Sequence, residues 1–192
     1  MLDDHSRSNF CAGVLALFPA FGLAFVLFLV LGALRAPHAQ EGNAVRIVAI
    51  GASNTSGWLI SSRLAYPAVL QDMLRARGIK AEVINAGQPF DTTSGMLARI
   101  DVDVPPDAEI VILQPGGNDR RFFGTKERRS ANIEAMKQHL HARAIRVIVY
   151  DEEIPWRYVF DGIHLTAAGH RMVASALLPQ VEALIERKAR QQ

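Results

Sequence analysis

The sequence predicts an α/β fold, a three-layer α/β/α sandwich around a short parallel sheet, preceded by an N-terminal hydrophobic helix. Three observations predict it. After Ala44, short apolar runs alternate with amphipathic stretches, Gly and Pro stand at the ends of these stretches, and no segment is repeated. Because strands separated by helices pair in parallel through right-handed crossovers, helices are expected on both faces of the sheet.

Each predicted element has its own local signal. An apolar run that ends at Gly51 is typical of a buried strand. The first predicted helix begins at Tyr66, with Pro67 in its first turn, and ends before Gly78. Pro in the first turn and Gly just past the end are typical of helix ends. In chain order the expected strands are residues 45–50, 81–85, 109–113 and 145–150, and the expected helices are residues 66–77, 94–100, 126–143 and 166–187.

Composition bounds the class of protein. A length of 192 residues with 49% hydrophobic content fits one domain with a packed core. The formal net charge is only +2, with 21 Lys and Arg against 19 Asp and Glu, and the basic residues are scattered among acidic ones. We therefore expect no nucleic-acid partner. Cys11 is the single cysteine, so the rest of the chain forms no disulfide and uses no thiol chemistry.

The N-terminal part differs from the rest. Residues 10–34 form an uncharged apolar run that is longer than the roughly 20 residues needed to cross a bilayer. Small residues suited to signal-peptidase cleavage follow in residues 36–42. A cleaved signal peptide and an uncleaved membrane anchor both remain open. Either one divides the chain into residues 1–39 and a domain of residues 40–192, and exports that domain to the periplasm or the extracellular space.

Polar loops follow the predicted strands, where ligands bind in parallel sheets. Ser53, after the first strand, is placed to act as a nucleophile, although serine is also a common helix cap. Gly116, Gly117 and Asn118 follow the third strand. Paired glycines let the backbone approach a ligand and an Asn amide can donate to an oxyanion, but the same residues also suit an ordinary turn.

Two further loops complete the set. Asp161 and His164 are three residues apart and are joined through a glycine, so the carboxylate can fix the imidazole tautomer for proton transfer. The alternative is an Asx-type turn with a surface histidine. In residues 85–93, after the second strand, a backbone N–H is a candidate for a second oxyanion donor.

Together these blocks resemble the SGNH/GDSL hydrolase family of serine esterases and lipases. The matching segments are IVAIGASNTSG, VINAGQPFDTTSGMLARI, VILQPGGNDRR and DGIHLTAAGHRMVA, in this order along the chain. The resemblance implies a flavodoxin-like hydrolase fold with no metal or cofactor. It implies that Ser53 is the nucleophile, that His164 is the general base and that Asp161 orients this histidine.

The resemblance also implies an oxyanion hole made by Ser53, Phe90 and Asn118. Substrate contacts are expected at Gly117 and at Trp58, for which burial in the core is the alternative. The implied activity is hydrolysis of carboxylic esters or thioesters through an acyl-enzyme. A small ester, a lipid-like ester or an acylated glycan is the expected substrate, and the membrane is a partner only through an uncleaved N-terminal segment.

The sequence departs from the family pattern in three places. Ala52 replaces the Asp that usually precedes the nucleophile, and Phe90 stands where the second block normally has its oxyanion Gly. The segment of residues 151–160 is shorter than in many members of the family, which predicts an open, shallow site. These departures motivate the alternative hypothesis of a catalytically impaired member that binds an acyl or glycan ligand.

Overall fold

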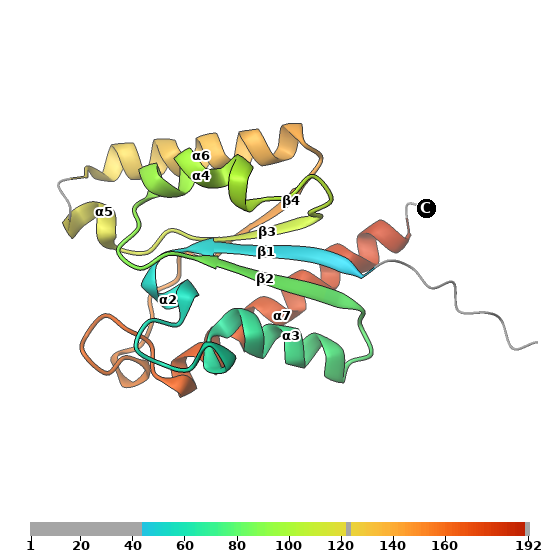
Figure 1. Cartoon of the computed structure of the whole chain (residues 1–192), viewed down its shortest axis with the longest axis horizontal. Helices are drawn as coiled ribbons and strands as arrows, with labels where there is room; N and C mark the ends of the chain where they lie inside the picture. The colour runs from blue at the N-terminus through green and yellow to red at the C-terminus, as the bar shows by residue number, and fades with distance from the viewer. Residues whose placement is uncertain (1–43, 122–123, 191–192) are drawn as a thin grey trace, which may run out of the picture. The chain divides into compact units, whose positions relative to one another are not determined.

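A four-stranded, fully parallel sheet forms the centre of the fold (Figure 1). The computed structural model describes residues 44–121 and 124–190. In spatial order the strands are β2 (Ala81–Gly87), β1 (Val45–Gly51), β3 (Ile110–Gln114) and β4 (Arg146–Val149). The predicted α/β class and parallel sheet are confirmed.

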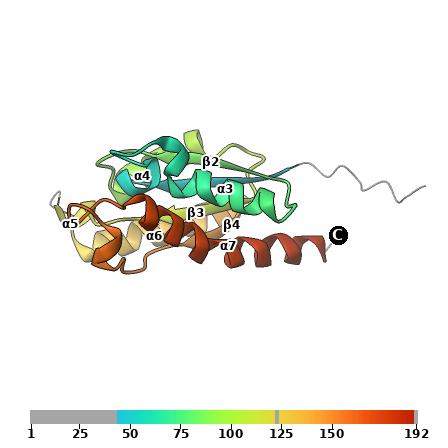
Figure 2. The ribbon, with the colours of Figure 1, turned by 90° about the horizontal axis from the view of Figure 1, so that it is seen from below.

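Helices cover both faces of the sheet, which confirms the three layers. Helices α3 and α7 pack together on one face, while α4 and α6 cover the other face (Figures 1 and 2). The helices are α2 (Ser53–Ser56), α3 (Tyr66–Ala76), α4 (Thr93–Asp103), α5 (Asn118–Arg121), α6 (Lys126–Ala142) and α7 (Ala167–Ala189), and the 3₁₀ turns are η1 (Ser62–Leu64) and η2 (Trp156–Tyr158).

The predicted N-terminal hydrophobic helix, residues 10–34, lies outside the described residues. None of the helices in the described ranges combines the length and the apolar character that a bilayer span needs.

The two central strands supply most of the core. All residues of β3 and the last five residues of β1 are buried, as expected for strands that are covered on both faces. On β1, Ile47 and Ala49 face the layer of α3 and α7, while Val48 and Ile50 face the layer of α4 and α6. This alternation explains why the β1 sequence is a continuous apolar run.

The helix boundaries follow local capping chemistry. Helices α4, α6 and α7 each begin after a threonine whose hydroxyl accepts a backbone N–H three residues later. Helix α4 runs to Asp103, beyond the expected end at residue 100. Neither α2 nor α5 was expected as a helix. Each has four residues, which is too short for a periodic apolar pattern to reveal.

The strand order creates a crevice between β1 and β3. The chain runs from β1 to β2 on one side and then crosses to β3 on the other side, so the loops after β1 and β3 diverge. Two glycines allow α2 to pack tightly beside this point. A Cβ on Gly51 would lie 2.0 Å from Thr55 Oγ1, and a Cβ on Gly87 would lie 2.2 Å from the Ser56 nitrogen. The topology thus places Ser53 at the mouth of the crevice.

His170 has a structural role on α7. It is 1% exposed, and its Nδ1 accepts the backbone N–H of Tyr66 over 3.1 Å. Burial lowers the pKa of His170 from its ordinary value of 6.5 to about 4, because the charged imidazolium is disfavoured inside the protein.

We therefore expect the stability of the protein to depend on His170 below pH 6.5. The unfolded chain takes up this proton as the pH falls through 6.5, whereas the folded chain takes it up only near pH 4. Stability from this group is complete above pH 6.5 and is lost between pH 6.5 and 4. Thermal unfolding of wild type and His170→Asn, which keeps an acceptor for Tyr66, measures the difference. Equal pH slopes in both proteins would contradict the assignment.

Candidate active site

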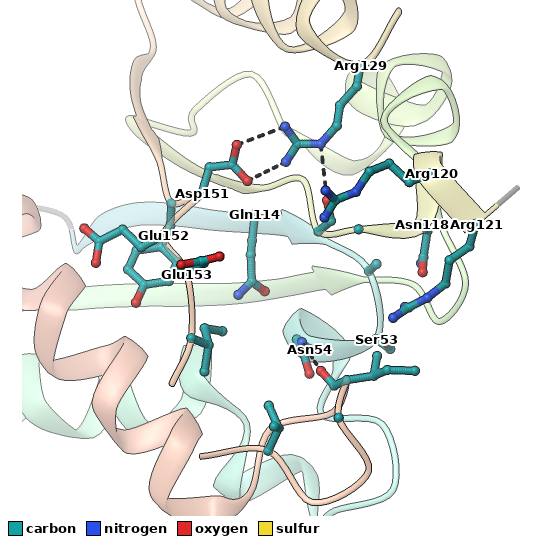
Figure 3. A pocket seen from close by; sticks show the side chains of 18 of the residues that line it. Ser53, Asn54, Gln114, Asn118, Arg120, Arg121, Arg129, Asp151, Glu152 and Glu153 are labelled. Carbon is teal, nitrogen blue, oxygen red and sulfur yellow. Dashed lines mark hydrogen bonds and ion pairs between the residues drawn. The ribbon is translucent and has the colours of Figure 1, made fainter. Parts of the chain in front are cut away.

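A cavity of about 660 Å³ opens at the carboxyl ends of β1 and β3 (Figure 3). This volume is in the range of small-molecule sites. Its lining comes from the segments that follow β1, β3 and β4 and from the loop before α7: Ala52, Ser53, Asn54, Gly116, Gly117, Asn118, Tyr150, Asp151, Glu152, Glu153, Ile154, Gly162 and Ile163 are among the lining residues. The cavity therefore lies where the strand topology places a ligand.

Ser53 is the first residue of α2 and lines the cavity. The cap of this helix is Ala52, and no side chain caps it, so the capping interpretation of Ser53 is wrong. The backbone N–H groups in the first turn of a helix have no acceptor within the helix. Ser53 thus brings a hydroxyl and a backbone donor to the cavity together.

Asp161 and His164 form the predicted pair. Asp161 Oδ2 lies 2.6 Å from His164 Nδ1, and Asp161 Oδ1 accepts the backbone N–H groups of Ile163 and His164 at 3.0 and 2.7 Å. The turn and the side-chain pair therefore coexist. Hydrogen bonding to the His164 side chain is the main cause that lowers the pKa of Asp161 to about 2. This carboxylate is consequently ionised at any ordinary pH and holds the Nδ1 proton of His164.

Asn54 holds the loop of His164 against the helix of Ser53. Its Nδ2 donates to the Ile163 carbonyl, and its Oδ1 accepts the Leu165 N–H, each over 3.0 Å. These two partners are the residues directly before and after His164, and Asn54 directly follows Ser53. Ser53 Oγ and His164 make no hydrogen bond to each other within the described part of the chain. Such catalytic contacts are often long without substrate.

Phe90 and Asn118, from the second and third matching sequence segments, are the other two residues of the predicted oxyanion hole. Asn118 Nδ2 donates to the Asp91 carbonyl over 2.8 Å, and a side-chain amide has a second N–H for a ligand. Phe90 has φ of 65°, a left-handed conformation that costs an L-residue about 1–2 kcal/mol. Glycine adopts this conformation freely. The backbone at Phe90 thus keeps the shape that a glycine would give it.

The two predicted substrate contacts differ. Gly117 lines the cavity, whereas Trp58 does not. Trp58 is 38% exposed, so it is not buried in the core either. It packs edge-to-face on Phe90, with ring centroids 5.5 Å apart. The aromatic pair therefore joins the segment after α2 to the loop that follows β2, which contains Phe90.

Arg99 does not line the cavity, but it holds segments beside it together, a role that the sequence did not predict. From α4 it donates to Asp91 Oδ2 at 2.9 Å, to the Ala86 carbonyl at 2.8 Å and to the Gly51 carbonyl at 3.2 Å. It therefore ties together the ends of β1 and β2 and the loop that follows β2. The sequence signal is its pairing with Asp103 one helical turn later, which marks a structured arginine but not its partners in the loops.

A serine after the first strand, an amide after the third and an Asp–His pair on the neighbouring loop are the residue set of a serine hydrolase. The sequence model of the GDSL-like Lipase/Acylhydrolase family matches residues 49–158, more than half of the chain, and the chain belongs to this family. The matched span includes Ser53 and Asn118 and ends before Asp161.

Named relatives agree with this family. The chain is 25% identical over 120 residues to "Esterase TesA" of Pseudomonas aeruginosa, a match that spans 62% of this chain but only 60% of that esterase. It is 28% identical over 162 residues to an arylesterase of Vibrio mimicus, covering 79% of this chain and 76% of the relative. The crystal structure of AlinE4, an SGNH-hydrolase family esterase, matches with a TM-score of 0.55 and 33% identity over 60% of this chain and 63% of that chain.

Proposed function

We propose that the protein is a serine esterase that cleaves carboxylic esters or thioesters through an acyl-enzyme. One observation carries the proposal: Asn54, which directly follows Ser53, hydrogen-bonds to the backbone on both sides of His164, so the loop of the Asp161–His164 pair is tied to the helix of Ser53. The names of the relatives support ester hydrolysis as the class of reaction.

The mechanism assigns one step to each group. Ser53 Oγ attacks the ester carbonyl carbon while His164 Nε2 takes the hydroxyl proton. Asp161 holds the Nδ1–H and stabilises the imidazolium that forms. His164 then returns the proton to the leaving alcohol or thiol. Water, deprotonated by the same histidine, attacks the acyl-enzyme and releases the acid from Ser53.

Hydrogen-bond donors from three segments would stabilise the developing oxyanion. These are the backbone N–H of Ser53, the backbone N–H at Phe90 and the second amide N–H of Asn118. The positive φ of Phe90 supports its place in this set, because it preserves the backbone direction of the usual glycine. Each such donor is worth about 10²–10³ in turnover.

The binding-module alternative also has a specific observation in its favour. Ala52, with no polar side chain, occupies the capping position before Ser53 and packs 6% exposed, and Phe90 holds a strained backbone. A member impaired by these changes would bind an acyl or glycan ligand without turnover. Turnover itself separates the two functions.

The proposed function includes several classes of ester substrate. We propose a small ester, a lipid-like ester or an acylated glycan, because the segment of residues 151–160 holds a single 3₁₀ turn and leaves the cavity open. Export of the domain, through a signal or an anchor in residues 10–34, remains a prediction from sequence.

Pre-steady-state hydrolysis of 4-nitrophenyl acetate by the full-length chain tests the proposed function. A burst of nitrophenol equal to the enzyme concentration, with one acetyl group added to the protein mass, is the expected result. A folded protein that gives neither a burst nor steady turnover on a panel of neutral esters and thioesters would contradict the proposal and favour the binding module.

Asn54→Ala is expected to lower kcat by about 10–100-fold, because a displacement of the order of 1 Å in the reacting groups has effects of this size. KM should change less than kcat, since the other residues that line the cavity stay in place. The matched control is Ser56→Ala, which removes a hydrogen bond on the same helix to the Ser53 carbonyl without touching the His164 loop. Comparable kcat losses in both variants, measured with 4-nitrophenyl acetate, would show that Asn54 acts only through the stability of α2.

A further inference from the structure

The cavity beside Ser53 has a cationic wall. Arg120 and Arg121 lie on α5, two and three residues after Asn118, and Lys126 is the first residue of α6. All three line the cavity and are exposed. Figure 3 shows Arg121 reaching from α5 toward Ser53. The positive charge is therefore concentrated on the side of the cavity that carries the proposed oxyanion residues.

One cation of this lining pairs with a carboxylate, and the three others do not do so within the described residues. Arg129, the fourth cation of the lining, pairs with Asp151 and donates to the Gly116 carbonyl, so it is part of the scaffold. Among residues 44–121 and 124–190, no carboxylate forms an ion pair with Arg120, Arg121 or Lys126. Within these ranges, three cationic groups thus remain for a ligand.

The opposite wall is acidic. Glu152 and Glu153 follow β4 and lie across the cavity from Arg121 (Figure 3). Since like charges repel and opposite charges attract, an anionic group that enters the cavity is directed toward Arg120 and Arg121. Arginine binds carboxylate and phosphate with two parallel hydrogen bonds, which adds geometric selection to the charge.

We propose that the preferred substrate is an ester that carries an anionic group, a carboxylate or a phosphate, bound by Arg120, Arg121 and Lys126 beside the scissile bond. This inference rests on the proposed esterase function and narrows its substrate class. Arg120 and Arg121 act as specificity determinants, and hydrolysis of neutral esters does not require them.

The test compares anionic esters with matched neutral ones on the full-length chain. Mono-4-nitrophenyl glutarate against 4-nitrophenyl pentanoate places the charge on the acyl side, and 5-acetoxy-2-nitrobenzoate against 4-nitrophenyl acetate places it on the leaving group. We expect the ratio of kcat/KM, anionic over neutral, to exceed one in at least one pair. We expect Arg121→Gln or Arg120→Gln to lower that ratio by roughly five- to tenfold. Raising the salt concentration should lower it too.

Arg128→Gln is the matched control, because Arg128 is an exposed arginine on α6 that does not line the cavity. Its ratio should equal that of wild type. The proposal would be overturned if the anionic-over-neutral ratio of kcat/KM were at or below one in both pairs, or if Arg120→Gln and Arg121→Gln left it unchanged. In either case, turnover of the neutral esters would still support the esterase function. An equal loss on anionic and neutral esters would also overturn the proposal, because the arginines would then serve the reaction and not the substrate charge. Absence of turnover on all four esters would overturn the esterase function, and the inference with it.

Discussion

Ser53→Ala is expected to lower kcat for ester hydrolysis by at least about 10⁴-fold, because the attacking oxygen is removed and only oxyanion stabilisation and binding remain. Ser53 is 9% exposed and caps no helix, so alanine fits its place without loss of a structural contact. Steady-state turnover of 4-nitrophenyl acetate measures the loss. Circular dichroism and the thermal unfolding midpoint check that the variant is folded.

Ser56→Ala is a control for Ser53→Ala, since it removes another serine hydroxyl from the same short helix. It should retain most of the activity. If Ser53→Ala kept even a tenth of wild-type turnover, an acyl-enzyme on Ser53 would be excluded and a different nucleophile or a bound water would have to be sought.

Asp161→Asn is expected to lower kcat by roughly 10⁴-fold, since an uncharged amide neither fixes the reactive imidazole tautomer nor stabilises the imidazolium. An Asn oxygen can still accept the backbone N–H groups of Ile163 and His164, so the turn should survive. A loss of turnover with an unchanged unfolding midpoint is the expected result. A loss of less than tenfold would contradict the role of Asp161 in proton transfer.

The low pKa of Asp161 also predicts how kcat/KM depends on pH. Hydrogen bonding to His164 lowers the pKa of Asp161 to about 2, so Asp161 stays ionised throughout the range in which the enzyme is assayed. Any loss of kcat/KM between pH 8 and about pH 5, above the pKa of about 4 of His170, should therefore fit the protonation of a single group. A second ionisation in that range would contradict the low pKa of Asp161.

Most of the fold follows from local sequence patterns. The apolar run predicts β1, because a strand that is buried on both faces needs apolar residues throughout. Pro67 and Gly78 predict the two ends of α3, because these residue types are typical of helix ends. Short helices give no such local sequence signal. Helices α2 and α5 have four residues each, and their existence depends on how the loops after β1 and β3 pack.

Some residues of the candidate site could likewise be predicted from the sequence. Ser53, Asn118, Asp161 and His164 stand at strand ends or beside a helix start, where topology alone gathers side chains. Asn54 was not predicted as a positioning residue, because its partners are backbone atoms more than 100 residues away in the chain. The carbonyl contacts of Arg99 were not predicted either, because Ala86 and Gly51 lie 13 and 48 residues away in the chain, on other elements.

Covalent labelling of the full-length chain with a fluorophosphonate probe shows directly whether Ser53 is an activated nucleophile, because the probe reacts with an activated serine whatever the natural ester is. We expect one adduct, mapped to Ser53 by peptide mass spectrometry, that is absent in Ser53→Ala and in His164→Ala. A folded wild-type protein that stays unlabelled, or an adduct that persists in Ser53→Ala, would contradict this role of Ser53.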